Sequence, residues 1–165
     1  MRIAIMRHGP AEDYAASGRD FDRALTPKGR ERVREVARAL LSAGEAPAEI
    51  VTSPLVRARE TAAELLEIFG ERPLEIARGL EPGRDVLGLV TDLFAEGREN
   101  AVLVGHEPDL SDVVAALVGA HPPQGMLKAM VVSIELTADT TSRHGRGFAS
   151  VSRFVLDPKT LVLHR

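Results

Sequence analysis

An arginine and a histidine stand together at the end of the first apolar segment of the chain. Residues 3–9 read IAIMRHG, so four apolar residues lead directly into Arg7, His8 and Gly9. The arginine guanidinium is a planar fork of N–H donors that matches the oxygens of a phosphate group in pairs. A neutral imidazole can attack phosphorus when its other nitrogen is held by an acceptor, and a glycine lets the backbone approach closely. The residue types at this position therefore suit phosphoryl chemistry.

Two later segments place the same residue types after apolar runs. Arg57 and Arg59 follow EIVT at 49–52, and His106 follows AVLVG at 101–105. Each motif alone also has a purely structural explanation. His8 could be a structural histidine, the arginines could be solvated residues early in a helix, and GHEP could be a simple turn. Their coincidence is informative, because cations gathered at one place repel one another unless an anion lies between them. The pattern favours a site for a tetrahedral dianion, with the second imidazole protonated and facing the phosphoryl oxygens.

The elements that must position these residues can be read from the hydrophobic periodicity. Thr26 and Pro27 open a helix whose apolar residues fall on one face, and residues 9–25 lack a period and are expected to form a loop. Strands are expected at 2–6, 49–52, 74–77, 101–105, 130–136, 148–156 and 161–163, and further helices from Ser53–Pro54, over about 86–94 and over about 109–119.

Strands that alternate with helices indicate an α/β domain. We expect a three-layer α/β/α sandwich whose central sheet is mostly parallel, with antiparallel edge strands near the C-terminus joined by a polar hairpin connection, TADTTSRHGRG. In such sheets ligands bind beyond the carboxyl ends of the strands. The residues after the strands at 2–6, 49–52 and 101–105 are therefore expected to meet at one edge of the sheet, together with the N-termini of helices near residues 54 and 109.

Length and composition exclude several classes of function. The 165 residues most simply form one domain over 1–165, and the lack of cysteine excludes disulfides and cysteine-ligated zinc. The net charge of −3 and an aromatic content of 4% argue against a nucleic-acid partner. No apolar run has the length of a signal peptide core or a membrane helix, so we expect no membrane association and a cytoplasmic location.

The other histidines of the chain lie outside the motifs described above. The five histidines are scattered without metal-ligand spacing, so no metal and no cofactor is expected. We expect His121, His144 and His164 to be surface residues.

The segments MRHG, SPLVRARETA and GHEP, in this order, resemble the histidine phosphatase superfamily, which shares the phosphoglycerate-mutase-like fold. The resemblance covers nearly the whole chain, and RALTPKGRERV and VLVGHEPDL are most similar to the SixA-type phosphohistidine phosphatases. It implies a metal-independent phosphatase with a role in signal transduction and no large lid insertion.

The resemblance also implies roles for individual residues. His8 matches the nucleophile, which would become a phosphohistidine, while Arg7, Arg57 and His106 match residues that hold the phosphoryl group. Arg59 is expected to face away from this set, and Arg23 to have a structural or rim role.

The proton donor is the gap in this assignment. Glu81, in RGLEPGRD, is the nearest candidate by order along the chain, and Glu107 beside His106 is a second. An alkoxide leaving group needs an acid, whereas an imidazole leaves more easily, so a weak donor would fit a phosphohistidine substrate.

Three functions stay open at this point. The first is removal of phosphate from a phosphohistidine-bearing protein, for which short segments after the motifs predict an open groove. The second is hydrolysis of a small phosphomonoester, and the third is a module that recognises phosphate without turnover. A phosphate or sulfate ion is expected to bind in the pocket, a monomer is favoured, and activity should fall below about pH 6.5 as a histidine nucleophile is protonated.

Overall fold

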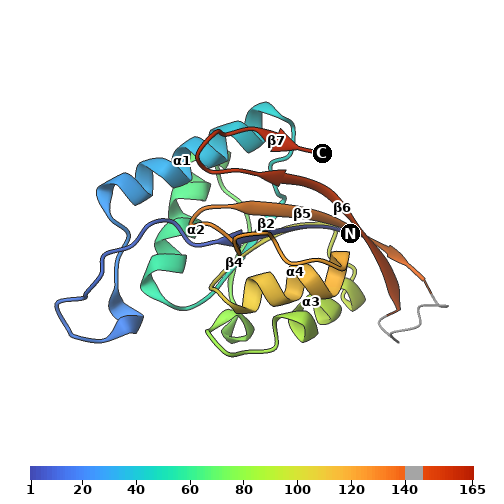
Figure 1. Cartoon of the computed structure of the whole chain (residues 1–165), viewed down its shortest axis with the longest axis horizontal. Coiled ribbons are helices and arrows are strands. Elements are labelled where there is room, and N and C mark those ends of the chain that lie inside the picture. The colour runs from blue at the N-terminus through green and yellow to red at the C-terminus, as the bar shows by residue number, and fades with distance from the viewer. Residues whose placement is uncertain (140–146) are drawn as a thin grey trace.

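The computed structural model describes residues 1–139 and 147–165 (Figure 1). Along the chain the elements are β1 (Arg2–Arg7), the 3-10 turn η1 (Asp20–Asp22), α1 (Pro27–Ser42), β2 (Glu49–Thr52), α2 (Val56–Phe69), β3 (Leu74–Ile76), the 3-10 turn η2 (Arg78–Leu80), α3 (Val86–Ala95), β4 (Asn100–Gly105), α4 (Asp109–Val118), β5 (Val131–Ala138), β6 (Phe148–Leu156) and β7 (Leu163–His164).

The strands form one mixed sheet in the order β3-β2-β4-β1-β5-β6-β7. The pairs β1–β4, β2–β4 and β2–β3 are parallel, and the pairs β1–β5, β5–β6 and β6–β7 are antiparallel. The predicted parallel core with antiparallel edge strands is therefore confirmed. Because β2, β4 and β1 are neighbours that run the same way, their carboxyl ends meet at one edge of the sheet.

Helices cover both faces of this sheet, as Figure 1 shows, with α1 and α2 on one side and α3 and α4 on the other. Alternation along β1 explains the two cores, because successive side chains of a strand point to opposite faces. Ile3 and Ile5 pack with α3 and α4, whereas Met6 packs with α1 and α2. The expected three-layer arrangement is present.

The helix starts follow their local sequence, with one correction. Thr26 caps α1 as predicted, and its hydroxyl accepts a hydrogen bond from the Gly29 amide. However, α2 begins at Val56 and not at Ser53–Pro54. The reason is that the Ser53 amide still donates to the Val104 carbonyl at 3.0 Å, so the chain leaves the sheet later than the SP motif suggests.

Smaller differences concern strand ends. β3 stops at Ile76, one residue before the predicted end, and β7 is formed by Leu163–His164 instead of 161–163. Residues 140–146 of the predicted hairpin connection lie outside the described part of the chain, but β5 and β6, which flank them, pair antiparallel as expected.

A close approach ties the loop after β1 to α1. A Cβ atom added to Gly29 would lie 1.9 Å from the carbonyl oxygen of Pro10, so only glycine fits there. The same carbonyl accepts a hydrogen bond from the Thr26 amide at 3.0 Å. The start of α1 therefore packs directly against the segment that follows His8. Among the described residues, no helix combines the length and the apolar character needed to cross a bilayer.

Candidate active site

The sheet register brings the motif residues together at the carboxyl ends of β1, β2 and β4. Arg7 pairs with Gly105 across the β1–β4 ladder, and the His8 amide donates to the Gly105 carbonyl at 3.1 Å. His106 follows Gly105 directly, and the rings of His8 and His106 are 5.2 Å apart, centroid to centroid. We call Arg7, His8, Arg57 and His106 the rim cluster.

The His8 ring is held in one orientation and kept neutral. Its Nδ1 lies 2.7 Å from the Gly9 carbonyl oxygen, an acceptor, so the ring proton belongs on Nδ1. Its Nε2 is then an acceptor, and the Arg57 Nε–H group donates to it at 3.3 Å. Burial, followed by the charges of Arg57 and Arg7, lowers the pKa of His8 to about 4, although the Gly9 hydrogen bond acts to raise it. At neutral pH Nε2 is therefore unprotonated, and its lone pair can attack once Arg57 Nε releases it.

His106 has a different set of neighbours. Its Nε2 lies 2.8 Å from the Ser53 hydroxyl oxygen, and this oxygen accepts a hydrogen bond from the Leu55 amide at 3.3 Å. If the hydroxyl proton points to Nε2, the proton of the neutral ring lies on Nδ1. That Nδ1 is buried and has no hydrogen-bond partner within the protein.

The charge state of His106 differs from the expectation of a protonated ring. Burial, followed by the charges of His8 and Arg57, lowers its pKa to about 3, so the protein by itself keeps the ring neutral. A phosphoryl dianion beside it would raise this pKa, because an opposite charge favours the protonated form.

The loop before α1 supplies a partner for Arg57 that the sequence did not suggest. The Arg57 guanidinium donates to the Asp20 carbonyl at 2.8 Å and to the Asp20 carboxylate at 3.0 Å. Arg23 donates to the same carboxylate at 2.8 Å. Burial acts to raise the pKa of Asp20, but Arg57 and Arg23 outweigh it and hold the pKa below its usual range.

Arg7 is held from the segment before β5. Its Nη1 donates to the Met126 carbonyl at 2.7 Å. The Met126 amide donates to the Ser111 hydroxyl at 3.1 Å, and that hydroxyl donates to Glu107 Oε2 at 2.6 Å. Burial lowers the pKa of Arg7, and the negative charge of Glu107 partly offsets this effect. Glu107 therefore belongs to the polar network on the Arg7 side of the site.

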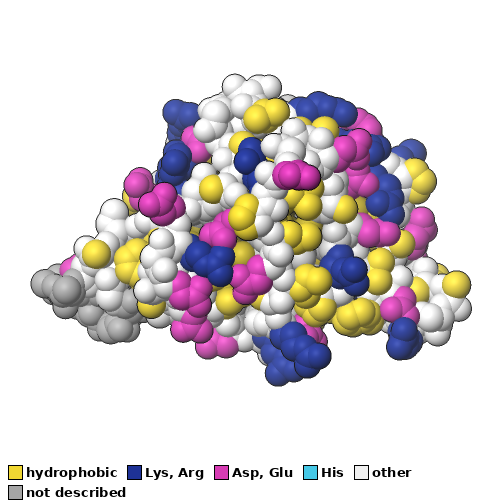
Figure 2. All heavy atoms as spheres, turned by 180° about the vertical axis from the view of Figure 1, so that it is seen from behind, with side chains coloured by type: hydrophobic (Ala, Val, Ile, Leu, Met, Phe, Trp, Pro, Cys, Tyr) yellow, Lys and Arg dark blue, Asp and Glu magenta, His cyan; other side chains and the backbone are white. Residues whose placement is uncertain are grey.

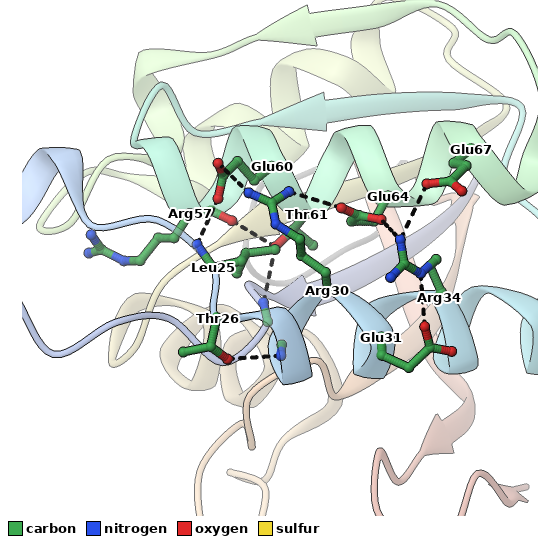
Figure 3. Close-up of polar contacts among 12 residues, drawn as sticks. Leu25, Thr26, Arg30, Glu31, Arg34, Arg57, Glu60, Thr61, Glu64 and Glu67 are labelled. Atoms are coloured by element: carbon green, nitrogen blue, oxygen red, sulfur yellow. Dashed lines mark hydrogen bonds and ion pairs between the residues drawn. The ribbon is translucent and has the colours of Figure 1, made fainter. Parts of the chain in front are cut away.

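Thr61 connects two parts of the site from behind. The Gly9 amide donates to its hydroxyl oxygen at 3.0 Å, and the hydroxyl donates to the Arg57 carbonyl at 2.7 Å. Figure 3 shows Thr61 and Arg57 on the same helix, above the start of α1. One side chain thus joins the residue after His8 to the helix that carries Arg57.

Unsatisfied polar atoms concentrate at this site. Within the described residues, four buried side-chain N or O atoms lack a hydrogen-bond partner, and three of them are Arg7 Nε, His106 Nδ1 and Glu107 Oε1. Buried polar groups are normally paired, so each such atom needs an explanation. Two of the three are nitrogens of the rim cluster, and an oxyanion bound between the arginine and the imidazole would satisfy both.

Comparison with known proteins agrees with this geometry. Residues 3–82 match the histidine phosphatase superfamily (branch 1). The chain is 41% identical over 123 residues to an uncharacterized protein of Picosynechococcus, covering 71% of this chain and 73% of that protein. It is 29% identical over 148 residues to a phosphohistidine phosphatase SixA homolog of Haemophilus influenzae, covering 81% and 87% of the two chains. The structure of the protein histidine phosphatase SixA complexed with tungstate superposes with a TM-score of 0.81 at 26% identity, covering 98% of this chain and 100% of that one.

The chain belongs to the histidine phosphatase superfamily. In this histidine phosphatase the four residues of the rim cluster, predicted from separate motifs, lie together, and His8, Arg57 and His106 are all at most 5% exposed. Arg59 is exposed, as expected for a residue facing away, and Arg23 lies in the loop before α1, where it binds Asp20.

Glu81 is placed differently from the cluster. It directly follows η2, next to Leu80, whose side chain lies near Gly105. Among the described residues its carboxylate takes part in no hydrogen bond or ion pair, whereas Glu107 is bound into the network with Ser111. Of the other histidines, His121 and His164 are exposed as predicted, and His144 lies outside the described residues.

Sequence reasoning missed three residues that shape the site of this histidine phosphatase. Thr61 could have been found, because it lies four positions after Arg57 and so shares its side of the helix. Ser53 was noticed only as a helix start. Asp20 lies in a segment with no period and carries no local indication of its role, since its partner is 37 positions away.

Proposed function

We propose that this histidine phosphatase removes phosphate from phosphohistidine on a protein, through a covalent phosphohistidine formed on His8. The observation that carries the proposal is the orientation of the His8 ring, with Nδ1 against the Gly9 carbonyl and Nε2 directed to Arg57. A nucleophile held in one tautomer beside cations is the arrangement that phosphoryl transfer requires. The name of the similar Haemophilus influenzae protein supports the substrate class.

The reaction proceeds in two displacements. In the first, His8 Nε2 forms a bond to phosphorus while the bond from phosphorus to the substrate imidazole nitrogen breaks, and that nitrogen takes up a proton. In the second, water attacks phosphorus, the bond to His8 breaks, and inorganic phosphate leaves. Arg57 Nε, which donates to Nε2, must release it for the attack and can then donate to a phosphoryl oxygen.

The charge of the transferring group is met by the rest of the rim cluster. The unpaired nitrogens Arg7 Nε and His106 Nδ1 are available to phosphoryl oxygens. Arg57 Nε joins them once it has released His8, while its other two nitrogens stay bound to Asp20. Two guanidinium groups supply positive charge to the transition state and the His106 ring supplies a further donor, so we infer that no added metal or cofactor takes part.

The contacts of Glu81 and Glu107 support a role as proton donor to different extents. Glu107 lies in the polar network beside Arg7 and has a buried, unpaired Oε1, whereas the Glu81 carboxylate makes no hydrogen bond or ion pair to any residue that the structure describes. Since an imidazole leaving group needs little protonation by an acid, a donor role for either glutamate is compatible with a phosphohistidine substrate. Glu107 is the better supported donor, and Glu81 the alternative.

The shape of the fold favours a large substrate. The connections from β2 to α2 and from β4 to α4 are short, at 53–55 and 106–108, and add no lid over the rim cluster. We infer that 1–165 acts as a single domain without a large lid insertion, open to a residue on another protein. A small phosphomonoester is the alternative substrate, and recognition of phosphate without turnover is the further alternative.

The test is to trap the intermediate. A histidine-phosphorylated protein carrying labelled phosphate is mixed with the enzyme, quenched within seconds in alkali, and digested to locate the label. We expect label on His8, and we expect His8→Ala to lose both label and turnover by at least about 1,000-fold. His121→Ala, at an exposed residue outside the site, is the control and should behave as wild type.

The outcomes separate the alternatives. Label on another residue would overturn the nucleophile, and rapid hydrolysis of one small phosphomonoester with little action on phosphohistidine would favour the second function. Tight binding of the phosphoprotein without any release of phosphate would favour the third.

A further inference from the structure

A groove of about 420 Å³ lies between α2 and the edge strand β3. Its walls include Val56 and Ala63 from the helix and Leu74 and Ile76 from the strand. The groove is not part of the chemistry described above, because the rim cluster does not line it.

The groove adjoins the site through residues that are neighbours in the chain. Thr52, which lines the groove, precedes Ser53, whose hydroxyl contacts His106. Val56 and Arg59 line the groove on either side of Arg57, which turns inward and is only 4% exposed. The first turn of α2 therefore faces the rim cluster with one side and the groove with the other.

The strand wall of the groove is an exposed apolar edge. Among the described strands, β3 stands at the end of the sheet and pairs with β2 alone. The side chains of Leu74 and Ile76 are 46% and 52% exposed. Natural proteins usually cover or charge such an edge, since its free N–H and C=O groups can pair with another chain. Figure 2, a view from behind, shows hydrophobic side chains at the surface among charged ones.

The helix wall carries an unpaired positive charge. Arg59 is exposed and, among the described residues, makes no ion pair or side-chain hydrogen bond. Glu60 lies beside it, but its carboxylate is already bound by Arg30 at 2.6 Å and by the Leu25 amide at 2.6 Å, as Figure 3 shows. The groove thus combines an apolar wall with a guanidinium that has no acidic partner within residues 1–139 and 147–165.

We propose that this groove docks the protein substrate through an extended segment next to its phosphohistidine, which places an apolar side chain against Leu74 and Ile76 and a carboxylate against Arg59. The inference rests on the proposed function, because it names the surface that recognises that substrate. Charge complementarity selects a carboxylate for Arg59, and because the groove adjoins the site, the segment lies beside the phosphoryl group.

A second copy of the chain fits the groove less well. A stable dimer buries about 800 Å² on each partner, whereas β3 offers an edge of only three residues. A transient substrate needs a smaller contact, because the phosphoryl group supplies part of the binding.

The experiment compares peptides and variants. Two synthetic peptides, each phosphorylated on one histidine with phosphoramidate, differ only in their flanks: Leu and Asp in one, Ala in the other. p-Nitrophenyl phosphate is the small substrate. In wild type we expect the Leu/Asp peptide to have a higher kcat/KM than the Ala peptide, because its KM is lower. Arg59→Glu and Ile76→Ser should each lower kcat/KM for the Leu/Asp peptide about tenfold more than they lower kcat/KM for p-nitrophenyl phosphate.

Matched controls lie far from the groove. Arg2→Glu, at an exposed arginine at the other end of β1, makes the same change in charge, and Val151→Ser removes a side chain that is 59% exposed on β6. In both controls, the ratio of kcat/KM for the Leu/Asp peptide to kcat/KM for p-nitrophenyl phosphate should equal the wild-type ratio.

Each outcome decides one question. If wild type does not hydrolyse either peptide, the proposed function fails, and the docking inference with it. If wild type hydrolyses both peptides, but the groove variants and the controls give the same ratio of kcat/KM for the Leu/Asp peptide to that for p-nitrophenyl phosphate, only the docking inference is overturned. It is also overturned if light scattering shows a wild-type dimer that Arg59→Glu dissociates while the ratio stays unchanged.

Discussion

Thr61 shows how a single hydroxyl can hold together two parts of a site that come from different elements. It accepts from the Gly9 amide and donates to the Arg57 carbonyl. Gly9 and Thr61 are both buried, so no water can replace the lost partner if the hydroxyl is removed. The relative position of His8 and Arg57 therefore depends on a residue that touches neither reacting group.

Replacement of Thr61 by Val keeps the shape and removes both hydrogen bonds. We expect a loss of about 1–3 kcal/mol in the free energy of unfolding, because the Gly9 N–H is left unsatisfied. We also expect a fall in kcat of about 10- to 100-fold from misplacement of the nucleophile. Urea titration and steady-state kinetics measure the two effects.

Thr91→Val is the matched control for this change. The Thr91 hydroxyl donates only to the Leu87 carbonyl within α3, away from the rim cluster. A control that loses as much activity as Thr61→Val would contradict the positioning role of Thr61.

The ionisation of His8 also acts at the residue scale. The sequence predicted a loss of activity below about pH 6.5, the ordinary imidazole value. Burial and the neighbouring arginines lower the pKa of His8 to about 4. The nucleophile thus stays unprotonated well below pH 6.5, and the acid limb of kcat/KM for p-nitrophenyl phosphate should be displaced toward pH 4. An enzyme limb that stays at pH 6.5, once the ionisation of the substrate is accounted for, would contradict this environment for His8.

At the scale of elements, α2 is fixed against α1 by ion pairs shown in Figure 3. Glu64, whose side chain is 7% exposed, accepts from Arg30 at 2.9 Å and from Arg34 at 2.9 Å. Glu67 lies one turn further along α2 at 3.5 Å from Arg34 and is 61% exposed. Both carboxylates pair with α1, but Glu64 is buried and its two contacts are shorter, so we expect Glu64 to contribute more to holding the helix that carries Arg57 against α1.

Glu64→Gln should therefore lower the free energy of unfolding by about 1–3 kcal/mol, because hydrogen bonds to a charged, buried group are lost. Glu67→Gln, with the same chemical change at an exposed position, should alter it by less than about 0.5 kcal/mol. Urea midpoints at two salt concentrations test the pair. Equal effects of the two substitutions would show that the buried ion pairs do not fix α2.

For the whole molecule, the two buried imidazoles couple stability to pH. Their pKa values in the folded protein are about 4 for His8 and about 3 for His106, below the value of about 6.5 in an unfolded chain. The unfolded state therefore binds more protons than the folded state between these values. It follows that the free energy of unfolding is greatest above pH 6.5 and falls as pH decreases toward 4.

Urea unfolding of the wild type between pH 5 and 7 should show this slope. Carboxylates with lowered pKa, such as Asp20, act mainly at lower pH, so this window isolates the imidazoles. His8→Asn and His106→Asn should each reduce the slope. A wild-type curve that is flat across the window, or variants with an undiminished slope, would exclude this coupling.

The sequence by itself determined the kinds of element, their order and the residues that follow the strands. Strand and helix periods, the Thr26 cap and the motifs around Arg7, Arg57 and His106 depend on side chains within a few positions, so one chain suffices to read them. The meeting of the motifs also followed, because parallel strands end at one edge.

Only the tertiary structure decided how these residues are held and charged. The Asp20 contact to Arg57, the Thr61 link to Gly9 and the Ser53 contact to His106 join positions 37, 52 and 53 apart. The lowered pKa values depend on burial by residues from several elements. These properties arise from distances and solvent exclusion between remote segments, and such quantities have no counterpart in local sequence.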